Sequence, residues 1–290
     1  MQNRRDFLKR ASLLVAGGLV APQILSSCAG GASKNIGLQL YSLRDLVKES
    51  GIQVVLETVS KMGYKNLETA GYDNGKVYGL APAEFKKMVT DLGMKCTSAH
   101  LGQAFTKEKE AEVMAWWDQA IEAHNELGVK YMVQPFMPVN DQTTLDDLKM
   151  YCDYFNTVGY KTASASIAFG YHNHDFEFRK IEDQLIYDFL LKTVSKNHVF
   201  FELDVYWCMM GGQDPAKYLK DYAGQFKAVH IKDEKEIGAS GKMDFKPIFD
   251  QMNTNNIKDW YVEVEQYTDN DPVLSVQQSF DFLNKAEYVK

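Results

Sequence analysis

The sequence predicts a single α/β domain in which eight β-strands alternate with eight α-helices and close into a (β/α)8 barrel. Four strand-like segments carry this prediction, each led by β-branched or aromatic residues and each holding His, Asp or Glu near its end: Phe169–Phe178, Phe200–Trp207, Ala228–Asp233 and Trp260–Tyr267. They begin about 30 residues apart, which is the length of one strand–helix unit. Barrels of this kind carry out their chemistry at the carboxyl ends of the strands.

Four further units precede these segments. Their strands are predicted at Ile36–Tyr41, Lys65–Thr69, Lys95–His100 and Lys130–Pro135, and the helices that follow at Val54–Met62, Pro82–Leu92, Lys107–Leu127 and Thr144–Tyr160. Proline at the start of the second helix suits a first turn. Apolar side chains recur at helical spacing in the third helix, and Gly128 ends the pattern.

The last four helices fill the intervals after the segments that carry His, Asp and Glu. They are predicted at Leu185–Val194, Pro215–Tyr222, Phe245–Gln251 and Val273–Ala286. Asp214 and Asp271 each precede a proline, an N-cap followed by a first-turn proline, and Asp244 is expected to cap the seventh helix. Composition does not change along this stretch, so residues 36–290 are predicted to form one domain.

The first 27 residues have the pattern of an export signal. Asn3–Lys9 contains a twin-arginine pair, Leu13–Val20 is a short apolar run, and Leu25–Cys28 resembles a lipoprotein cleavage box. The apolar run is too short for a membrane span. We expect cleavage before Cys28, an exported protein anchored by lipid on that cysteine, and a polar linker over 28–35. The alternative is an ordinary signal peptide in which Cys28 is incidental.

The charge of the remaining chain excludes some partners. The 290 residues carry 32 basic and 39 acidic side chains, and the leader contains four of the former and one of the latter. The mature chain of 263 residues therefore has a net charge of −10, which disfavours nucleic acid as a partner. Apart from Cys28, the cysteines are Cys96, Cys152 and Cys208, and their spacing indicates buried thiols rather than a metal motif. The alternative is one disulfide in an oxidising compartment, whose pair the sequence does not identify.

Alternation along the last four strands sorts their polar residues into faces. Glu202 and Asp204 share a face, as do Glu263 and Glu265, and in each pair the second residue is expected nearer the mouth of the barrel. The second of each pair is therefore the better metal-ligand candidate. The first is left as a group that supports a ligand or contacts substrate.

The two histidine strands add nitrogen ligands. His172 shares a face with His174, and His230 shares one with Lys232. A site made of Asp204, His230, Glu265 and one of the two strand-five histidines suits Mn, Co, Fe, Ni or Zn better than Ca or Mg. The alternative is a hydrogen-bonded network at the barrel mouth without metal. Further polar or aromatic candidates stand at other strand ends: Tyr41, Glu68, His100 and Trp207.

At this point the chain resembles the sugar phosphate isomerase/epimerase family, whose fold is a xylose isomerase-like TIM barrel. The resemblance spans nearly all of 35–290 and rests on Gly37–Asp45, Gly63–Glu68, Gly170–Phe178, Glu202–Trp207, His230–Asp233 and Val262–Gln266. It implies one divalent metal held by Glu, Asp, His and Glu from strands five to eight. Asp204, His230 and Glu265 match the last three, while His172 stands where the family has glutamate. His172 is slightly favoured over His174 for that place.

The resemblance also implies the chemistry. A metal that chelates a carbonyl and the adjacent hydroxyl of a sugar or ketosugar would stabilise an enediolate, with Glu265 or His174 as the base and Lys232 as acid or charge stabiliser. Two departures matter, because Glu265 is the one remaining glutamate of the expected acid–base pair and Trp207 replaces a substrate-binding histidine. The expected substrate contacts are Tyr41, Glu68, His100, Glu177, Glu202 and Trp207.

The expected function is therefore a metal-dependent isomerase or epimerase of a small sugar, in a chain that can form homo-oligomers. One alternative is a lyase or hydrolase that cleaves 3-ketoglycosides by β-elimination. Another is a barrel that binds carbohydrate without catalysis. An apurinic-site endonuclease of the same superfamily is disfavoured, because it needs a three-zinc cluster and a basic groove, and this acidic chain has six histidines.

Overall fold

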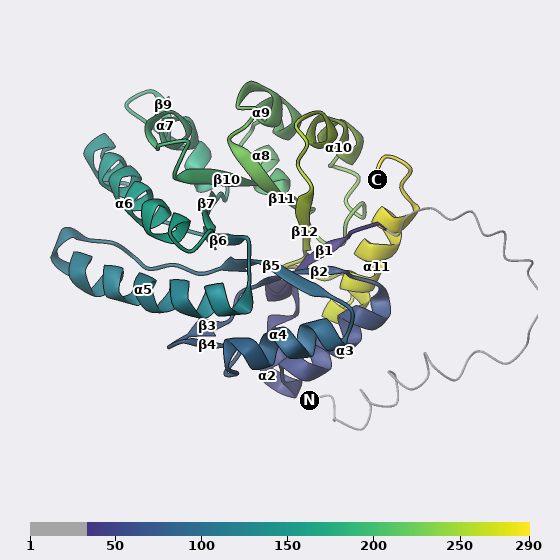
Figure 1. Cartoon of the computed structure of the whole chain (residues 1–290). Coiled ribbons are helices and arrows are strands. Elements are labelled where there is room, and N and C mark those ends of the chain that lie inside the picture. The colour runs from purple at the N-terminus through teal and green to yellow at the C-terminus, as the bar shows by residue number, and fades with distance from the viewer. Residues whose placement is uncertain (1–33) are drawn as a thin grey trace, which may run out of the picture. The chain divides into compact units, whose positions relative to one another are not determined.

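The computed structural model describes residues 34–290, and these form a closed, eight-stranded parallel barrel surrounded by helices (Figure 1). The strands neighbour one another in the order β1-β12-β11-β10-β7-β6-β5-β2, which closes the ring by pairing β2 with β1. This confirms the predicted fold class. Their bounds are Gly37–Gln39 (β1), Asn66–Thr69 (β2), Lys95–His100 (β5), Tyr131–Gln134 (β6), Ala168–His172 (β7), Val199–Asp204 (β10), Phe226–Lys232 (β11) and Asp259–Glu263 (β12). The expected signal, linker start and Cys28 lie outside the described residues.

The helices form the outer layer (Figure 1). The eight predicted helices overlap observed ones, whereas α2 and α8 were not predicted. None of the helices within 34–290 is both long enough and apolar enough to cross a membrane. The bounds are Arg44–Ser50 (α2), Ile52–Met62 (α3), Pro82–Asp91 (α4), Glu110–Leu127 (α5), Leu145–Ala163 (α6), Ile186–Thr193 (α7), Val205–Met210 (α8), Pro215–Asp221 (α9), Phe245–Thr254 (α10) and Pro272–Lys285 (α11).

Side-chain caps fix where several helices begin. The carboxylates of Asp214, Asp244 and Asp271 accept backbone N–H groups at the starts of α9, α10 and α11, as predicted. At α6, Thr144 and Asp147 form a reciprocal capping box. These helix starts follow the carboxyl ends of the strands, so the caps help to fix the loops around the barrel mouth.

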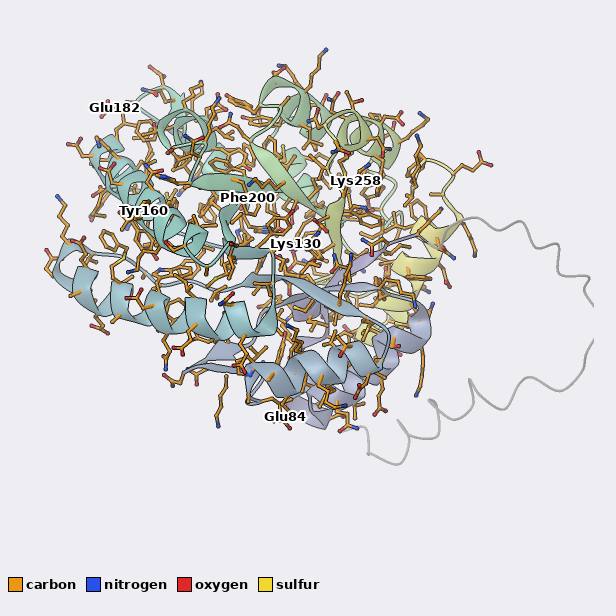
Figure 2. All side chains as sticks on the ribbon, viewed as in Figure 1. Glu84, Lys130, Tyr160, Glu182, Phe200 and Lys258 are labelled. Carbon is orange, nitrogen blue, oxygen red and sulfur yellow. The ribbon has the colours of Figure 1, made fainter. Side chains whose placement is uncertain are left out.

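The core lies on both sides of the strands. Val133, Phe200, Ala228 and Tyr261 pack together inside the ring, and apolar faces of the helices cover its outside. In Figure 2, Phe200 lies among the strands, whereas Glu84 and Tyr160 lie on the outer helices α4 and α6. The barrel is therefore a filled core, and the buried histidine and glutamate side chains of its inner face gather near the carboxyl ends of the strands.

The strand ends differ from the prediction in ways that matter for the site. β7 ends at His172 and is followed by a 3-10 turn at Phe176–Phe178, β10 passes directly into α8, and β12 ends at Glu263. The turn into α8 has a physical cause, because Asp204 is its N-cap and accepts the Trp207 N–H at 2.8 Å. Two short hairpins were not predicted, Tyr72–Asp73 with Lys76–Val77 (β3, β4) and Lys180–Ile181 with Gln184–Leu185 (β8, β9).

Candidate active site

Parallel pairing brings the polar residues of neighbouring strands together. Glu202 of β10 pairs with His172 of β7, Asp204 pairs with His230 of β11, and Lys232 pairs with Glu263 of β12. All five of the acidic and histidine side chains in these pairs are buried. The end of the barrel therefore holds a compact cluster of buried carboxylates and imidazoles, as the strand-end pattern predicted.

The cluster consists of two overlapping groups. Within each group, the potential ligand atoms all lie within 4.8 Å of one another. We call His172, Asp204, His230 and Glu263 the outer group, because Asp204 and Glu263 are the last residues of their strands. We call His100, His172, Glu202 and His230 the inner group, because Glu202 precedes Asp204 by two residues on β10. His172 and His230 belong to both groups.

In the outer group, the hydrogen bonds of each carboxylate go to one of its two oxygens. Glu263 Oε2 lies 3.2 Å from His230 Nδ1 and 3.0 Å from Lys232 Nζ. Asp204 Oδ2 is buried without a hydrogen-bond partner among the described residues, 3.9 Å from His172 Nε2. Burial raises the pKa of Asp204 to about 7. Burial would also raise the pKa of Glu263, but Lys232 and then His230 lower it well below its usual range.

The inner group is tied together by short contacts. His100 Nε2 lies 2.6 Å from Glu202 Oε2, and His230 Nε2 lies 2.6 Å from Glu68 Oε2. Gln39 Nε2 donates to the same Glu68 oxygen at 2.7 Å. Burial and the neighbouring Glu202 raise the pKa of Glu68, whereas His230 and His100 hold the pKa of Glu202 well below its ordinary value against the effect of burial.

The charges of the cluster do not balance by themselves. The cluster contains four buried carboxylates, those of Glu68, Glu202, Asp204 and Glu263. Among residues 34–290, Lys232 is the one buried lysine or arginine. Uncompensated buried anions are costly, so protons on histidine or a bound cation must offset them. The open oxygen of Asp204 and the mixed nitrogen and oxygen donors of the outer group fit a divalent transition-metal ion.

The structure brings three of the four predicted metal ligands together and leaves the fourth aside. His172, Asp204 and His230 lie in the outer group, but its eighth-strand carboxylate is Glu263 rather than Glu265. Glu265 lies beyond the end of β12, with its side chain 29% exposed and its carboxylate 2.6 Å from Lys232 Nζ. The prediction assumed that the outermost acid faces the site. The strand ends at Glu263, two residues before Glu265, and the Val264 N–H bonds instead to Ser42 Oγ of the first unit.

His174 lies outside both groups. Its ring stacks on Phe176 at a centroid distance of 5.7 Å and lies 6.0 Å from Trp207. Burial, together with Lys232 nearby, lowers the pKa of His174 to about 4, so its imidazole is neutral at pH 7. The strand-five histidine of the cluster is therefore His172, and His174 lies outside the cluster.

Lys232 joins the cluster to the rim. Its Nζ contacts both Glu263 and Glu265 and lies 5.2 Å from the centre of the Trp207 ring. Burial would lower the pKa of Lys232, but the carboxylates of Glu263 and Asp204 raise it above its ordinary value. The lysine therefore stays charged, which suits a donor or charge stabiliser and not a base.

The expected substrate contacts fall into three kinds of surroundings. Glu68, His100 and Glu202 are part of the buried cluster itself. Tyr41 is 43% exposed and lies under the Arg44 guanidinium at 4.6 Å. Glu177 is fully buried and accepts hydrogen bonds from Tyr171 Oη and the His174 N–H, so its carboxylate holds its own segment together and does not face a ligand.

One contributor was not predicted. Asn173 Oδ1 accepts the Asp204 N–H at 3.1 Å, and Asn173 Nδ2 donates to the Asp204 carbonyl at 3.4 Å. This side chain clips the end of β7 to the end of β10 and so fixes the spacing of His172 and Asp204. The only signal in the sequence is its place between two histidines.

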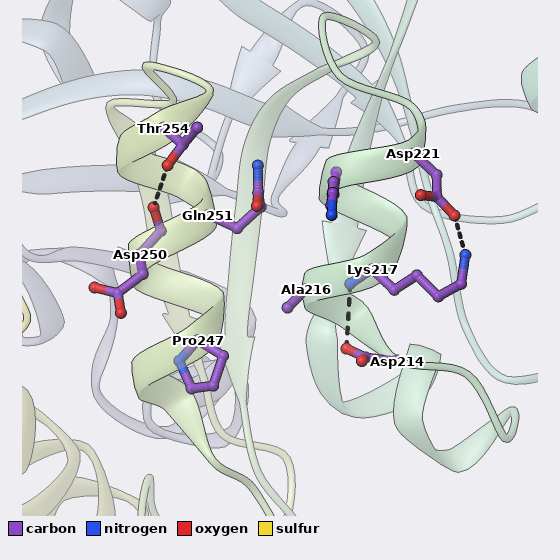
Figure 3. Close-up of a pocket in the computed structure, with 9 residues that line it drawn as sticks. Asp214, Ala216, Lys217, Asp221, Pro247, Asp250, Gln251 and Thr254 are labelled. Atoms are coloured by element: carbon purple, nitrogen blue, oxygen red, sulfur yellow. Dashed lines mark hydrogen bonds and ion pairs between the residues drawn. The ribbon is translucent and has the colours of Figure 1, made fainter.

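A separate groove of about 620 Å³ lies between α9 and α10 (Figure 3). Its charged side chains are used within their own helices, since Lys217 pairs with Asp221 and Asp214 caps α9. It contains neither histidine nor a second layer of buried carboxylates, and it contributes nothing to the cluster. The lining residues are Asp214, Ala216, Lys217, Lys220, Asp221, Pro247, Asp250, Gln251 and Thr254.

Comparisons with known proteins agree with this geometry. Residues 56–286 match the family model described as a xylose isomerase-like TIM barrel. A sugar phosphate isomerase/epimerase from Parabacteroides distasonis is 38% identical with a TM-score of 0.84, over 89% of this chain and all of that one. Inosose dehydratase of Clostridium beijerinckii is 24% identical, over 88% of this chain and 94% of the relative. The 3-keto-D-glucoside 4-epimerase of E. coli, 20% identical over 87% of this chain and all of that one, shares the fold with a TM-score of 0.64. The chain therefore belongs to the xylose isomerase-like TIM barrel family, as its sequence motifs predicted.

Proposed function

We propose that this protein is a divalent-metal-dependent enzyme that removes the proton next to the carbonyl of a ketosugar or a related cyclic ketone, and so isomerises or epimerises it. The observation that carries the proposal is the outer group, in which two imidazoles and two carboxylates meet at the ends of four neighbouring strands beside a buried lysine. Isomerase/epimerase and dehydratase relatives of similar length support a polyol as the substrate.

His172, Asp204, His230 and Glu263 would hold the ion. Bound there, a divalent ion would polarise a carbonyl and an adjacent hydroxyl and so acidify the neighbouring C–H bond. Glu263 also accepts from Lys232, so the lysine is held at the edge of the group without occupying the open oxygen of Asp204. Lys232 thus supplies positive charge, while the free oxygen of Asp204 leaves room for a ligand.

The remaining roles belong to groups on the rim. Lys232 stays charged and can stabilise the oxyanion of an enediolate or return a proton to it. Two groups near it can accept the α-proton, the neutral imidazole of His174 and the partly exposed carboxylate of Glu265. The indole of Trp207 could pack against the C–H-rich side of a sugar ring, since the residue is only partly buried.

Elimination is the second candidate outcome. The same enediolate can take its proton back, which gives an epimer or isomer, or lose a hydroxyl or glycoside from the β-carbon. The dehydratase names of relatives that align over 94% of their length favour the second outcome. Export with a lipid anchor on Cys28, proposed from the sequence, would suit an unphosphorylated substrate.

The test is solvent-proton exchange followed by product analysis. The chain loaded with Mn²⁺ or Zn²⁺ is incubated in heavy water with a 3-ketoglucoside and, separately, with a keto-inositol, and proton NMR follows the signal next to the carbonyl. We expect the signal of the proton next to the carbonyl to disappear as deuterium replaces it. A new sugar among the products would indicate epimerisation or isomerisation, and an eliminated product would indicate β-elimination. His174→Gln and Glu265→Gln distinguish the two bases. A metal-loaded protein that binds the ketone without any exchange would overturn the proposal in favour of a binding protein.

A further inference from the structure

The two shared histidines present one ring nitrogen to each group. His230 Nδ1 lies 3.2 Å from Glu263 Oε2 on the outer side, and its Nε2 lies 2.6 Å from Glu68 Oε2 on the inner side. His172 Nε2 lies 3.9 Å from Asp204 Oδ2, and its Nδ1 lies 3.3 Å from Glu202 Oε2, which is within ion-pair distance but is not an aligned hydrogen bond in this structure. In both rings the inner contact is the shorter one.

A neutral imidazole has one lone pair and one N–H, so each ring can serve one ion at a time. If both groups held ions at once, His172 and His230 would each have to lose the second ring proton. The two groups are therefore alternatives, and the group without the ion must accept the two N–H bonds. All four carboxylates are buried, but those on the inner side, Glu68 and Glu202, lie closer to the shared rings than Glu263 and Asp204 do.

The outer side has the wider spacing. Buried carboxylate oxygens without a hydrogen-bond partner among the described residues lie on both sides, Asp204 Oδ2 on the outer side and Glu68 Oε1 and Glu202 Oε1 on the inner side. The contact from His172 Nε2 to Asp204 Oδ2, at 3.9 Å, is the longest that either shared ring makes with a carboxylate of the cluster. On the inner side, Glu202 Oε2 is already within 2.6 Å of His100 Nε2, and Gln39 supports Glu68 Oε2 at 2.7 Å. An ion there would have to displace these contacts.

We propose that Glu68 and Glu202 are positioning residues, which accept the N–H of His230 Nε2 and His172 Nδ1 and thereby aim the opposite nitrogens of both rings at an ion in the outer group. This inference rests on the metal site of the proposed function and goes beyond it, because it gives each inner carboxylate one histidine. Carboxylate partners of metal-bound histidines typically change metal affinity by about 10- to 100-fold. His100, stacked on His230 at 4.9 Å, shares the Glu202 oxygen and is not a ligand.

Variants of Glu68 and Glu202 serve as controls for each other. In the full chain labelled with ¹⁵N-histidine and loaded with Zn²⁺, long-range ¹H–¹⁵N spectra identify which nitrogen of each ring carries hydrogen. Signals of the six histidines are assigned with single His→Gln variants. We expect N–H at His230 Nε2 and at His172 Nδ1. Glu68→Leu should alter the His230 signal most, because its 2.6 Å contact is shorter than the 3.2 Å contact of Glu68 with His100. Glu202→Leu should alter the signals of His172 and His100, and that of His230 through a 3.2 Å contact, but only Glu68→Leu should leave His172 unchanged. Each variant should bind zinc about 10- to 100-fold more weakly.

Isosteric variants separate charge from shape. All the contacts of Glu202 with histidines go to Oε2, and Oε1 has no partner, so Glu202→Gln can keep an accepting oxygen in place. It should retain the N–H pattern and lose less affinity than Glu202→Leu. Glu236→Gln, at a buried carboxylate that bonds only Thr268 and Ser275, is the control for loss of a buried acid and should bind zinc normally.

Several results would overturn the inference. These are hydrogen on His230 Nδ1 or His172 Nε2 in the zinc form, unchanged affinity in both leucine variants, or loss of zinc in His100→Gln together with its retention in Asp204→Asn, which would put the ion in the inner group. If wild-type protein binds no zinc, the proposed function fails. The metal-free spectrum then still decides whether Glu68 accepts from His230 Nε2, because that N–H signal must move in Glu68→Leu.

Discussion

Substitution of Asp204 by Asn should stabilise the metal-free protein while removing its metal site. Burial raises the pKa of this carboxyl from an ordinary 3.8 to about 7. The folded state therefore keeps the proton up to pH 7, whereas the unfolded state releases it near pH 4. Between these values the folded state binds more protons, so stability falls as pH rises, and the full penalty applies above pH 7. A shift of about three pKa units corresponds to roughly 4 kcal/mol.

Asn removes the charge and preserves the local structure. Its side-chain oxygen can still accept the Trp207 N–H at the start of α8, since Asn and Asp are comparable N-caps. The gain in unfolding free energy over wild type should thus be about 4 kcal/mol at pH 8 and roughly 2.5 kcal/mol smaller at pH 5, where the wild-type carboxyl is mostly protonated. Changes in stability that come from other titrating groups affect wild type and variant alike, so they cancel in the difference between the two unfolding free energies.

The assay is urea unfolding of both proteins with a chelator at pH 5 and pH 8. A second series contains Zn²⁺ at about 100 times its Kd, which should stabilise wild type by about 2.7 kcal/mol and the variant far less. A stability difference between the two proteins that is equal at both pH values would refute the reasoning, because it would mean that Asp204 is not held as a buried acid.

Three other outcomes follow from the structure. Burial lowers the pKa of His124 to about 4, so its folded form stays neutral and stability should fall by about 3 kcal/mol between pH 7 and pH 4; the acid slope of thermal unfolding should flatten in His124→Leu. Glu263→Gln should lose bound metal by elemental analysis, whereas Glu265→Gln should keep it, and the reverse would restore Glu265 as the ligand. Lys232→Met should retain metal yet slow proton exchange by 100-fold or more, and normal exchange would remove Lys232 from the chemistry.

Much of the fold was predictable because its signals are local. Helix caps at Asp214 and Asp271 and the strand–helix interval depend on neighbours in the chain, and the structure has them where the sequence predicted. The two hairpins after β2 and β7 were missed because each strand has two residues and no periodicity. They form where the chain turns through left-handed conformations at Asn74 and Gly75 and at Glu182 and Asp183.

The strands that carry the site could be predicted, but the individual side chains that meet there could be predicted only in part. Alternation along a strand identifies a shared face, so His172, Asp204 and His230 could be grouped from the sequence. The choice between Glu263 and Glu265 depends on where β12 stops, and that is decided by a hydrogen bond to Ser42 from the opposite end of the chain. The pairing of Glu68 with His230 joins residues 162 positions apart and leaves no local trace.

The histidine in place of the glutamate implied by the family resemblance explains why Glu202 can sit where it does. With glutamate at position 172, a second carboxylate would face Glu202 at the distance now spanned by the His172 Nδ1 contact of 3.3 Å, and two buried carboxylates at that distance cannot both ionise. The imidazole replaces a repulsion with an N–H donor. It also leaves the outer group with two carboxylates, those of Asp204 and Glu263, whose charges a divalent ion would balance. A neutral imidazole would give such an ion less negative charge than a carboxylate, so the substitution that removes one base of a two-glutamate mechanism would strengthen the ion's polarisation of a carbonyl.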